Sequence, residues 1–79
     1  MIKAYILIRA RVGKLENILK EARKLKNVES LAVVAGDYDI IIKAKVKELE
    51  DLMSLTDEIQ TIDGIKQTTT QVVEKEITV

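Results

Sequence analysis

The two halves of the chain have similar sequences, and this near-repeat limits the folds available to it. Residues 8–12 (IRARV) align with residues 42–46 (IKAKV), an offset of 34 positions (42 − 8), and residues 15–19 (LENIL) align with residues 49–53 (LEDLM). Convergence of two strand–helix units on similar patterns would explain the resemblance as well as a true repeat. In either case each half predicts a strand, a helix and a second strand.

The expected elements follow from hydrophobic periodicity and from residues that start or stop helices. Strands are predicted at residues 2–11, 28–35, 39–46 and 65–75. In the first helix Gly13 is the expected N-cap and Asn27 the left-handed C-terminal cap. The second helix has no obvious N-cap and is expected to end at Gly64. The apolar helix faces consist of Leu15, Ile18, Leu19, Ala22 and Leu25, and of Leu49, Leu52, Leu55 and Ile59.

The order βαββαβ is that of the ferredoxin-like α+β fold, a four-stranded antiparallel sheet with two helices on one face. Its strands should alternate apolar and polar residues if the other face met water. Instead Tyr5 and Leu7 lie between apolar neighbours, and Ile41 lies between Ile40 and Ile42. Since an exposed apolar sheet usually marks an interface, we expect a homodimer that packs these faces together.

Composition excludes several classes of function. The chain has 79 residues, enough for one domain, with no Cys or His, and Lys plus Arg (13) balance Asp plus Glu (13). A serine–histidine triad, a thiolate nucleophile and a zinc site with Cys or His ligands are therefore excluded, any metal site would need carboxylates alone, and no metal or cofactor is expected. Neutral charge argues against direct nucleic-acid binding. Without a secretory segment or an apolar run near ~18 residues, we expect a cytoplasmic protein without membrane contact, and the charge-rich composition is typical of thermophiles.

Two polar clusters are candidate binding residues. Gly36, Asp37, Tyr38 and Asp39 form a glycine-led turn between apolar runs, where carboxylates, a hydroxyl and backbone N–H groups could hold both charged ends of a free amino acid. An ordinary hairpin turn, with Asp39 bonded to the backbone of the turn itself, explains these residues equally well. The second cluster, Thr68–Gln71, lies in the last strand, with Thr68 and Thr70 on one face and Thr69 and Gln71 on the other. Simple β propensity is the structural alternative.

These residues together resemble the effector-binding RAM domain of the Lrp/AsnC transcription regulators. The motifs are Asn27-Val28-Glu29, Gly36-Asp37-Tyr38-Asp39, and Ile62-Asp63-Gly64-Ile65 followed by Thr68 and Thr70. The resemblance covers residues 4–74 and implies a single RAM-like domain over residues 1–79, without the helix-turn-helix domain of family regulators. Gln71 stands where family members often carry an aromatic residue.

The resemblance implies sheet-packed dimers, larger ring-like oligomers, and amino-acid effectors bound between dimers. Carried over by position, Gly36, Asp37, Tyr38 and Asp39 would form one side of the pocket. Thr68, Thr70 and Gln71 would form the other, with Asp39 orienting the amino group of the ligand. The expected function is non-catalytic sensing or assembly, alone or with full-length regulators. A small dimeric enzyme of the monooxygenase type is the alternative, although such enzymes usually need histidine, clustered aromatics or a cofactor.

Overall fold

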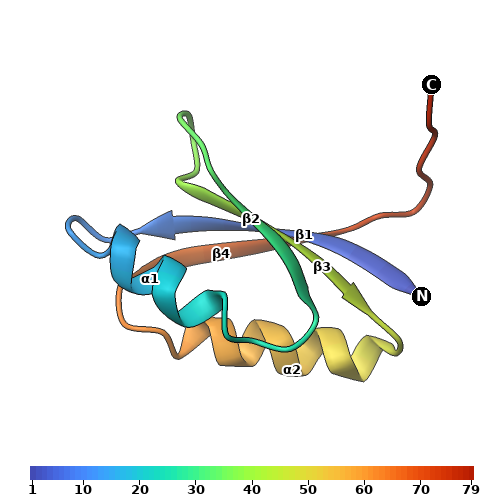
Figure 1. Cartoon of the computed structure of the whole chain (residues 1–79), viewed down its shortest axis with the longest axis horizontal. Helices are drawn as coiled ribbons and strands as arrows, with labels where there is room; N and C mark the ends of the chain where they lie inside the picture. The colour runs from blue at the N-terminus through green and yellow to red at the C-terminus, as the bar shows by residue number, and fades with distance from the viewer.

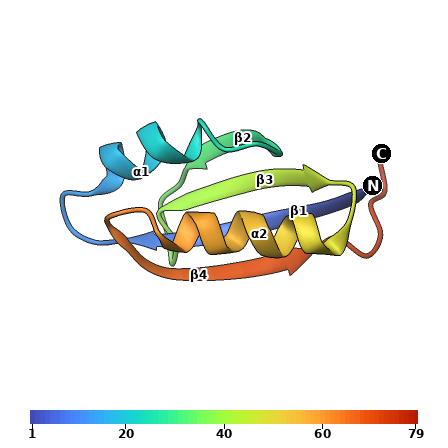
Figure 2. The same ribbon diagram turned by 90° about the horizontal axis from the view of Figure 1, so that it is seen from below.

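The computed structural model describes all residues, 1–79, and confirms the order βαββαβ. The strands are β1 (Ile2–Ala10), β2 (Val28–Val33), β3 (Ile40–Val46) and β4 (Ile65–Val72), and the helices are α1 (Leu15–Ala22) and α2 (Leu49–Gln60). The strands form one antiparallel sheet in the order β2-β3-β1-β4. Both helices lie on the same side of this sheet (Figures 1 and 2). The other side is called the open face below.

The near-repeat builds the centre of the sheet. Its strand segments are the paired strands β1 and β3, whose register aligns Ile8 with Ile40 and Ala4 with Ala44. Alternate residues of both strands point toward the helices and are buried. With side chains of α1 and α2 they form a single core: Ala4, Ile6, Ile8, Ile18, Ala22, Ile40, Ile42, Ala44, Val46, Leu52, Leu55 and Ile59. Of the predicted helix faces, Ile18, Ala22, Leu52, Leu55 and Ile59 are buried, and Leu15, Leu19 and Leu25 are partly buried against the core. The prediction was wrong for Leu49, which is 54% exposed at the first residue of α2.

The predicted helix ends were wrong in detail. Lys14, not Gly13, occupies the N-cap position of α1, while Gly13 takes a φ of +79° in the preceding turn. The N-terminus of α2 does have a cap, because the Asp51 carboxylate accepts a hydrogen bond from the Glu48 amide at 3.1 Å. Glu at an N-cap is uncommon, which explains why the pattern was not evident from the sequence.

Both helices end earlier than predicted. The helix α1 ends at Ala22, and Asn27, although left-handed with a φ of +76°, lies in the connection to β2. The helix α2 ends at Gln60 rather than Gly64. All four strands are also shorter than expected, most clearly β2, which ends at Val33, and β4, which ends at Val72. The ends depend on contacts between distant segments, such as the hydrogen bond from the Lys45 amide to the Asn27 carbonyl at 3.0 Å.

The open face has an apolar centre and a partly basic border. In an antiparallel pair, aligned residues point to the same side of the sheet, so the register identifies this face. Its centre contains the half-buried side chains of Tyr5, Leu7 and Ile41. Its other members are Lys3, Arg9, Ser30, Ala32, Lys43, Lys45, Gln67, Thr69 and Gln71. The two-faced strands predicted from the sequence are thus confirmed at the centre, while the surrounding residues are basic on β1 and β3 and uncharged on β2 and β4.

The C-terminal segment after β4 crosses toward β1. The Val73 amide donates to the Lys3 carbonyl at 2.9 Å, and the Lys3 Nζ lies 2.9 Å from Glu76 Oε1. This hydrogen bond raises the pKa of Lys3 and lowers the pKa of Glu76. By linkage, the contribution of the pair is lost as pH falls through the lowered pKa of Glu76 or rises through the raised pKa of Lys3. Both groups are therefore charged at neutral pH.

Candidate functional site

The turn between β2 and β3 comprises residues 34–39 and is longer than predicted. The Val34 amide donates to the Asp39 carbonyl at 2.9 Å and closes the loop. Gly36 has a φ of +147°, which confirms the predicted need for glycine. The amides of residues 35–38 donate no hydrogen bond within the chain. The tip of the turn therefore presents free N–H donors, and it projects from the sheet on the side away from the helices (Figure 1).

Asp39 ties the turn to the end of β1. Its carboxylate Oδ2 accepts a hydrogen bond from the Ala10 amide at 2.7 Å, and its own amide donates to the Ile8 carbonyl at 2.9 Å. Asp39 was expected, in the structural alternative, to bond the backbone of its own turn. Its carboxylate instead bonds the backbone of β1, so its role is structural but its partner differs. One carboxylate oxygen is occupied by this contact. Asp37, by contrast, is exposed and forms no ion pair.

We predict that Asp39→Ala lowers the free energy of unfolding by about 1–3 kcal/mol, since the partly buried Ala10 N–H would lose its acceptor. Asp37→Ala is the matched control, and its effect should stay within about 0.5 kcal/mol because Asp37 is an exposed surface residue. Urea unfolding of both variants measures the difference. Equal stabilities for the two variants would contradict the anchoring role of Asp39.

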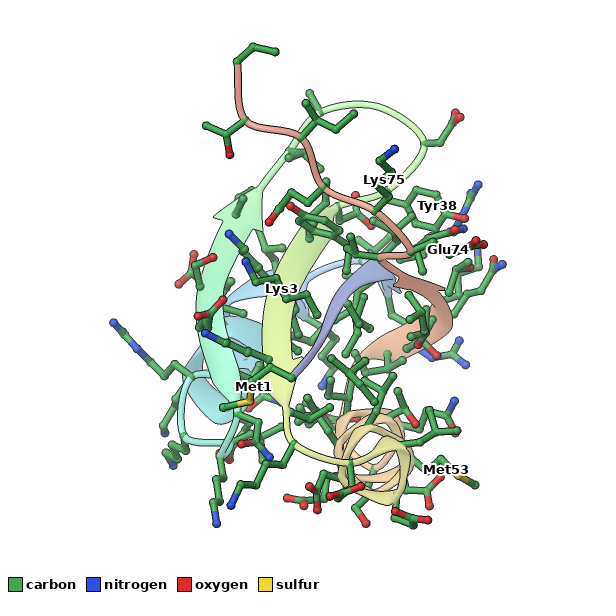
Figure 3. The ribbon with its side chains drawn as sticks, turned by 90° about the vertical axis from the view of Figure 1, so that its right-hand side faces the viewer. Met1, Lys3, Tyr38, Met53, Glu74 and Lys75 are labelled. Carbon is green, nitrogen blue, oxygen red and sulfur yellow. The ribbon has the colours of Figure 1, made fainter.

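Tyr38 reaches over the open face. Its hydroxyl lies 3.2 Å from Thr69 Oγ1 on β4, and the guanidinium carbon of Arg9 lies 5.2 Å from the centre of its ring. Tyr38 and Lys3 both lie on the side of the sheet opposite α2 and Met53 (Figure 3). The Arg9 Nε is buried and has no hydrogen-bond partner. A cation stacked on an aromatic ring is stabilised even without an acceptor. Arg9 and Tyr38 therefore couple the turn to the open face.

The structure divides the predicted strand residues between the two faces of the sheet. Thr68 and Thr70 align with Ile8 and Ile6, so they point to the helix side, where Thr68 Oγ1 lies 3.1 Å from Gln60 Nε2. Gln71 aligns with Tyr5 and lies on the open face. Within one chain the turn therefore meets Thr69 rather than Thr68 or Thr70.

Arg9 and Thr69 were not among the predicted site residues. The sequence did place Thr69 on the face opposite Thr68 and Thr70, as the structure confirms, but it did not show that Tyr38 would lie on that same face. A clue to Arg9 was present, since it has the two-residue spacing from Tyr5 and Leu7 that puts it on their face.

Two cavities lie near the ends of the helices. One of about 310 Å³ is beside the turn and is lined by Ala10, Arg11, Val12, Gly13, Leu15, Val33, Val34 and Asp39. A larger one of about 450 Å³ lies between α1 and α2, and no predicted site residue lines it. Volumes of this order suit small molecules. No group of three or more His, Cys, Asp or Glu side chains is arranged to hold a metal ion, and neither helix is long and apolar enough to cross a membrane.

A family model described as the Lrp/AsnC ligand binding domain matches residues 3–78, nearly the whole chain. The chain belongs to the Lrp/AsnC family. The HTH-type transcriptional regulator FL11 of Pyrococcus furiosus is 31% identical over 94% of this chain and 49% of its own length. Lrp/AsnC relatives of this kind are regulators, so the chain belongs to a regulatory and not an enzymatic family. It spans about half the length of the curated relatives that it matches.

Solved structures of the family share the fold. The structure of E. coli AsnC aligns with 99% of this chain and 54% of its own, with 26% identity and a TM-score of 0.90. A transcriptional regulator from Neisseria meningitidis, NMB0573, solved as an L-Met complex, aligns with 99% of this chain and 53% of its own. Its identity is 22% and its TM-score is 0.89, which shows likeness of fold. The ferredoxin-like architecture of this Lrp/AsnC domain is thus confirmed.

Proposed function

We propose that this Lrp/AsnC domain is a non-catalytic sensor that binds a free amino acid between subunits and thereby controls the assembly of transcription regulators in the cytoplasm. The observation that carries the proposal is the turn at residues 34–39. It is anchored by Asp39 and Tyr38, yet its tip has unpaired amides and a free carboxylate at Asp37. A fixed loop with free polar groups is preorganised for a ligand.

The chemistry of the turn suits a zwitterion. Free backbone N–H groups of Gly36 and Asp37 are donors for an α-carboxylate, and the carboxylates of Asp37 and Asp39 are acceptors for an α-ammonium group. Only the oxygen of Asp39 that is not bonded to Ala10 is available for this purpose. The L-Met complex of the Neisseria meningitidis regulator, which has the same fold, supports an amino acid as the ligand class.

The site needs a second subunit if Thr68 and Thr70 contribute to it. These hydroxyls lie on the face of the sheet opposite Tyr38 in their own chain, so one chain does not bring them to its turn. A neighbouring subunit that offers Thr68 and Thr70 to the turn would complete the pocket. Gln71 lies on the open face, so it would reach a turn from the opposite side of β4. The proposed assembly is a homodimer through the open face, and dimers then join into a larger oligomer or with full-length regulators. We propose no direct contact with nucleic acid or membrane.

Calorimetric titration with each of the twenty amino acids at millimolar concentration tests the proposal. We expect saturable heat for at least one of them, and a loss of affinity of about tenfold or more in Asp37→Ala, which removes one charge-assisted hydrogen bond. Lys20→Ala, on the exposed surface of α1, is the control and should leave the affinity unchanged. Absence of heat for every amino acid, with the oligomer intact, would refute a sensing function and leave only a role in assembly.

A further inference from the structure

One end of the open face carries a cluster of positive charge. Lys3 and Lys45 are aligned partners on β1 and β3, and Lys43 is aligned with Tyr5 beside them. We call Lys3, Lys43 and Lys45 the lysine end. All three side chains are partly buried, and none of the residues that the strand register places on this face is Asp or Glu. Glu29, at the register shift in β2, follows Glu76 among the acidic groups whose charge raises the pKa of Lys3. Like charges directly opposite each other destabilise a sheet, so carboxylates from another segment would stabilise this cluster.

The principal acidic partner of Lys3 is Glu76, which belongs to the segment 73–79, called the tail below. After Val73 the tail leaves the sheet on the side away from the helices and extends well beyond it (Figures 1 and 3). It contains Glu74 and Glu76, and the pKa of Glu76 is lowered by its hydrogen bond with Lys3 and by the charge of Lys3, and to a smaller extent by the charge of Lys43. The first residues of the tail therefore lie over the lysine end of their own chain.

The tail pairs with only one of the three lysines at the lysine end of its own chain. Glu76 pairs with Lys3, whereas Lys43 and Lys45 form no ion pair. The apolar residues of the tail are also uncovered, since Ile77 is 71% exposed and Val79 is fully exposed. A segment without regular secondary structure that exposes Ile and Val beyond its contacts with Lys3 is suited to docking on another surface.

We propose that the tail is an exchanged arm, whose Glu74 and Glu76 dock on the lysine end of a second copy of this chain. Charge complementarity identifies this end of the partner, because it carries three lysines, whereas the opposite end of the open face presents one cation, Arg9, together with the carboxylate of Asp37. By two-fold symmetry, two tails serve two lysine ends. The inference rests on the proposed dimer through the open face. It adds that the tail determines how the two subunits align on each other.

Charge reversal in mixed chains tests the exchange. A face variant carries Lys43→Glu and Lys45→Glu, and a tail variant carries Glu74→Lys and Glu76→Lys. Sedimentation equilibrium should show that each variant alone dimerises with a dissociation constant about tenfold or more above that of the unaltered chain. In an equimolar mixture the dissociation constant should return to within about threefold of that of the unaltered chain. In the mixed dimer the acidic tail of the face variant meets the lysine end of the tail variant, and the basic tail of the tail variant meets the acidic end of the face variant.

Matched controls keep the net charges equal. Lys20→Glu with Lys26→Glu, and Asp57→Lys with Glu58→Lys, make the same charge changes on the helix side and should leave dimerisation unchanged. A mixture no tighter than the separate variants would mean that the tail acts within its own chain and would overturn the proposal. Variants that dimerise like the unaltered chain would overturn it as well. An unaltered chain that stays monomeric would instead refute the dimer of the proposed function.

Discussion

Gly64→Ala should lower the free energy of unfolding by about 2–5 kcal/mol, from backbone strain and from a steric clash together. Gly64 is buried and has a φ of +108°, a region that other residues rarely adopt. An added Cβ would lie only 2.9 Å from Lys14 Cγ and still nearer to Lys14 Cβ, which cannot move without the backbone. The contact joins the connection before β4 to the start of α1.

The surrounding contacts prevent an easy shift. The Gly64 carbonyl accepts a hydrogen bond from the Arg11 amide at 2.7 Å, and the neighbouring Asp63 carbonyl accepts one from Asn17 Nδ2 at 2.9 Å. Gly13→Ala is the matched control, because Gly13 has a φ of +79° but open space around the added methyl group. It should cost about 1–2 kcal/mol from backbone strain alone. Equal losses in chemical denaturation would contradict the steric explanation.

Leu7→Glu should weaken dimerisation about 100-fold or more without unfolding the domain. Leu7 is at the centre of the open face, aligned with Ile41 on one side and Thr69 on the other, and it is half-buried in the single chain. A carboxylate there meets water in a monomer. In the proposed dimer, symmetry would bury two such charges near each other, and burial of unpaired ions costs several kcal/mol.

Met53→Glu makes the same kind of change on the helix side. Met53 is 60% exposed on α2 and should tolerate the carboxylate in either state of assembly. Sedimentation equilibrium of the two variants, with circular dichroism to verify the fold, measures the effect. A Leu7→Glu chain that dimerises like the unaltered one would show that the open face is not the interface.

The architecture was predictable because each half of the chain repeats the same hydrophobic periodicities. The core residues could be predicted from the alternation of residues in β1 and β3 and from the apolar stripe on α2, since these patterns depend on local backbone geometry. The positions of the helix ends and the role of Gly64 depend on residues far apart in the chain. Gly64 looked like a helix stop, and its close approach to Lys14 has no local signal.

The candidate site was only partly predictable for the same reason. Glycine and two aspartates mark the turn, but the partners of Tyr38 depend on the register between β1 and β4. The prediction that Thr68 and Thr70 share one face of the strand was correct, but the alternation alone does not show which face the helices cover. The pocket that joins the turn to Thr68 and Thr70 stays a prediction that requires a second subunit.

The affinity of the monomeric Leu7→Glu variant for an amino acid that the unaltered chain binds tests most directly whether the site is completed between subunits. Binding and assembly that share a site must be thermodynamically linked. We expect calorimetry to give an affinity at least about tenfold lower for the Leu7→Glu monomer than for the unaltered oligomer, while Met53→Glu binds normally. A Leu7→Glu monomer that binds the amino acid as tightly as the unaltered oligomer would contradict a pocket formed between subunits.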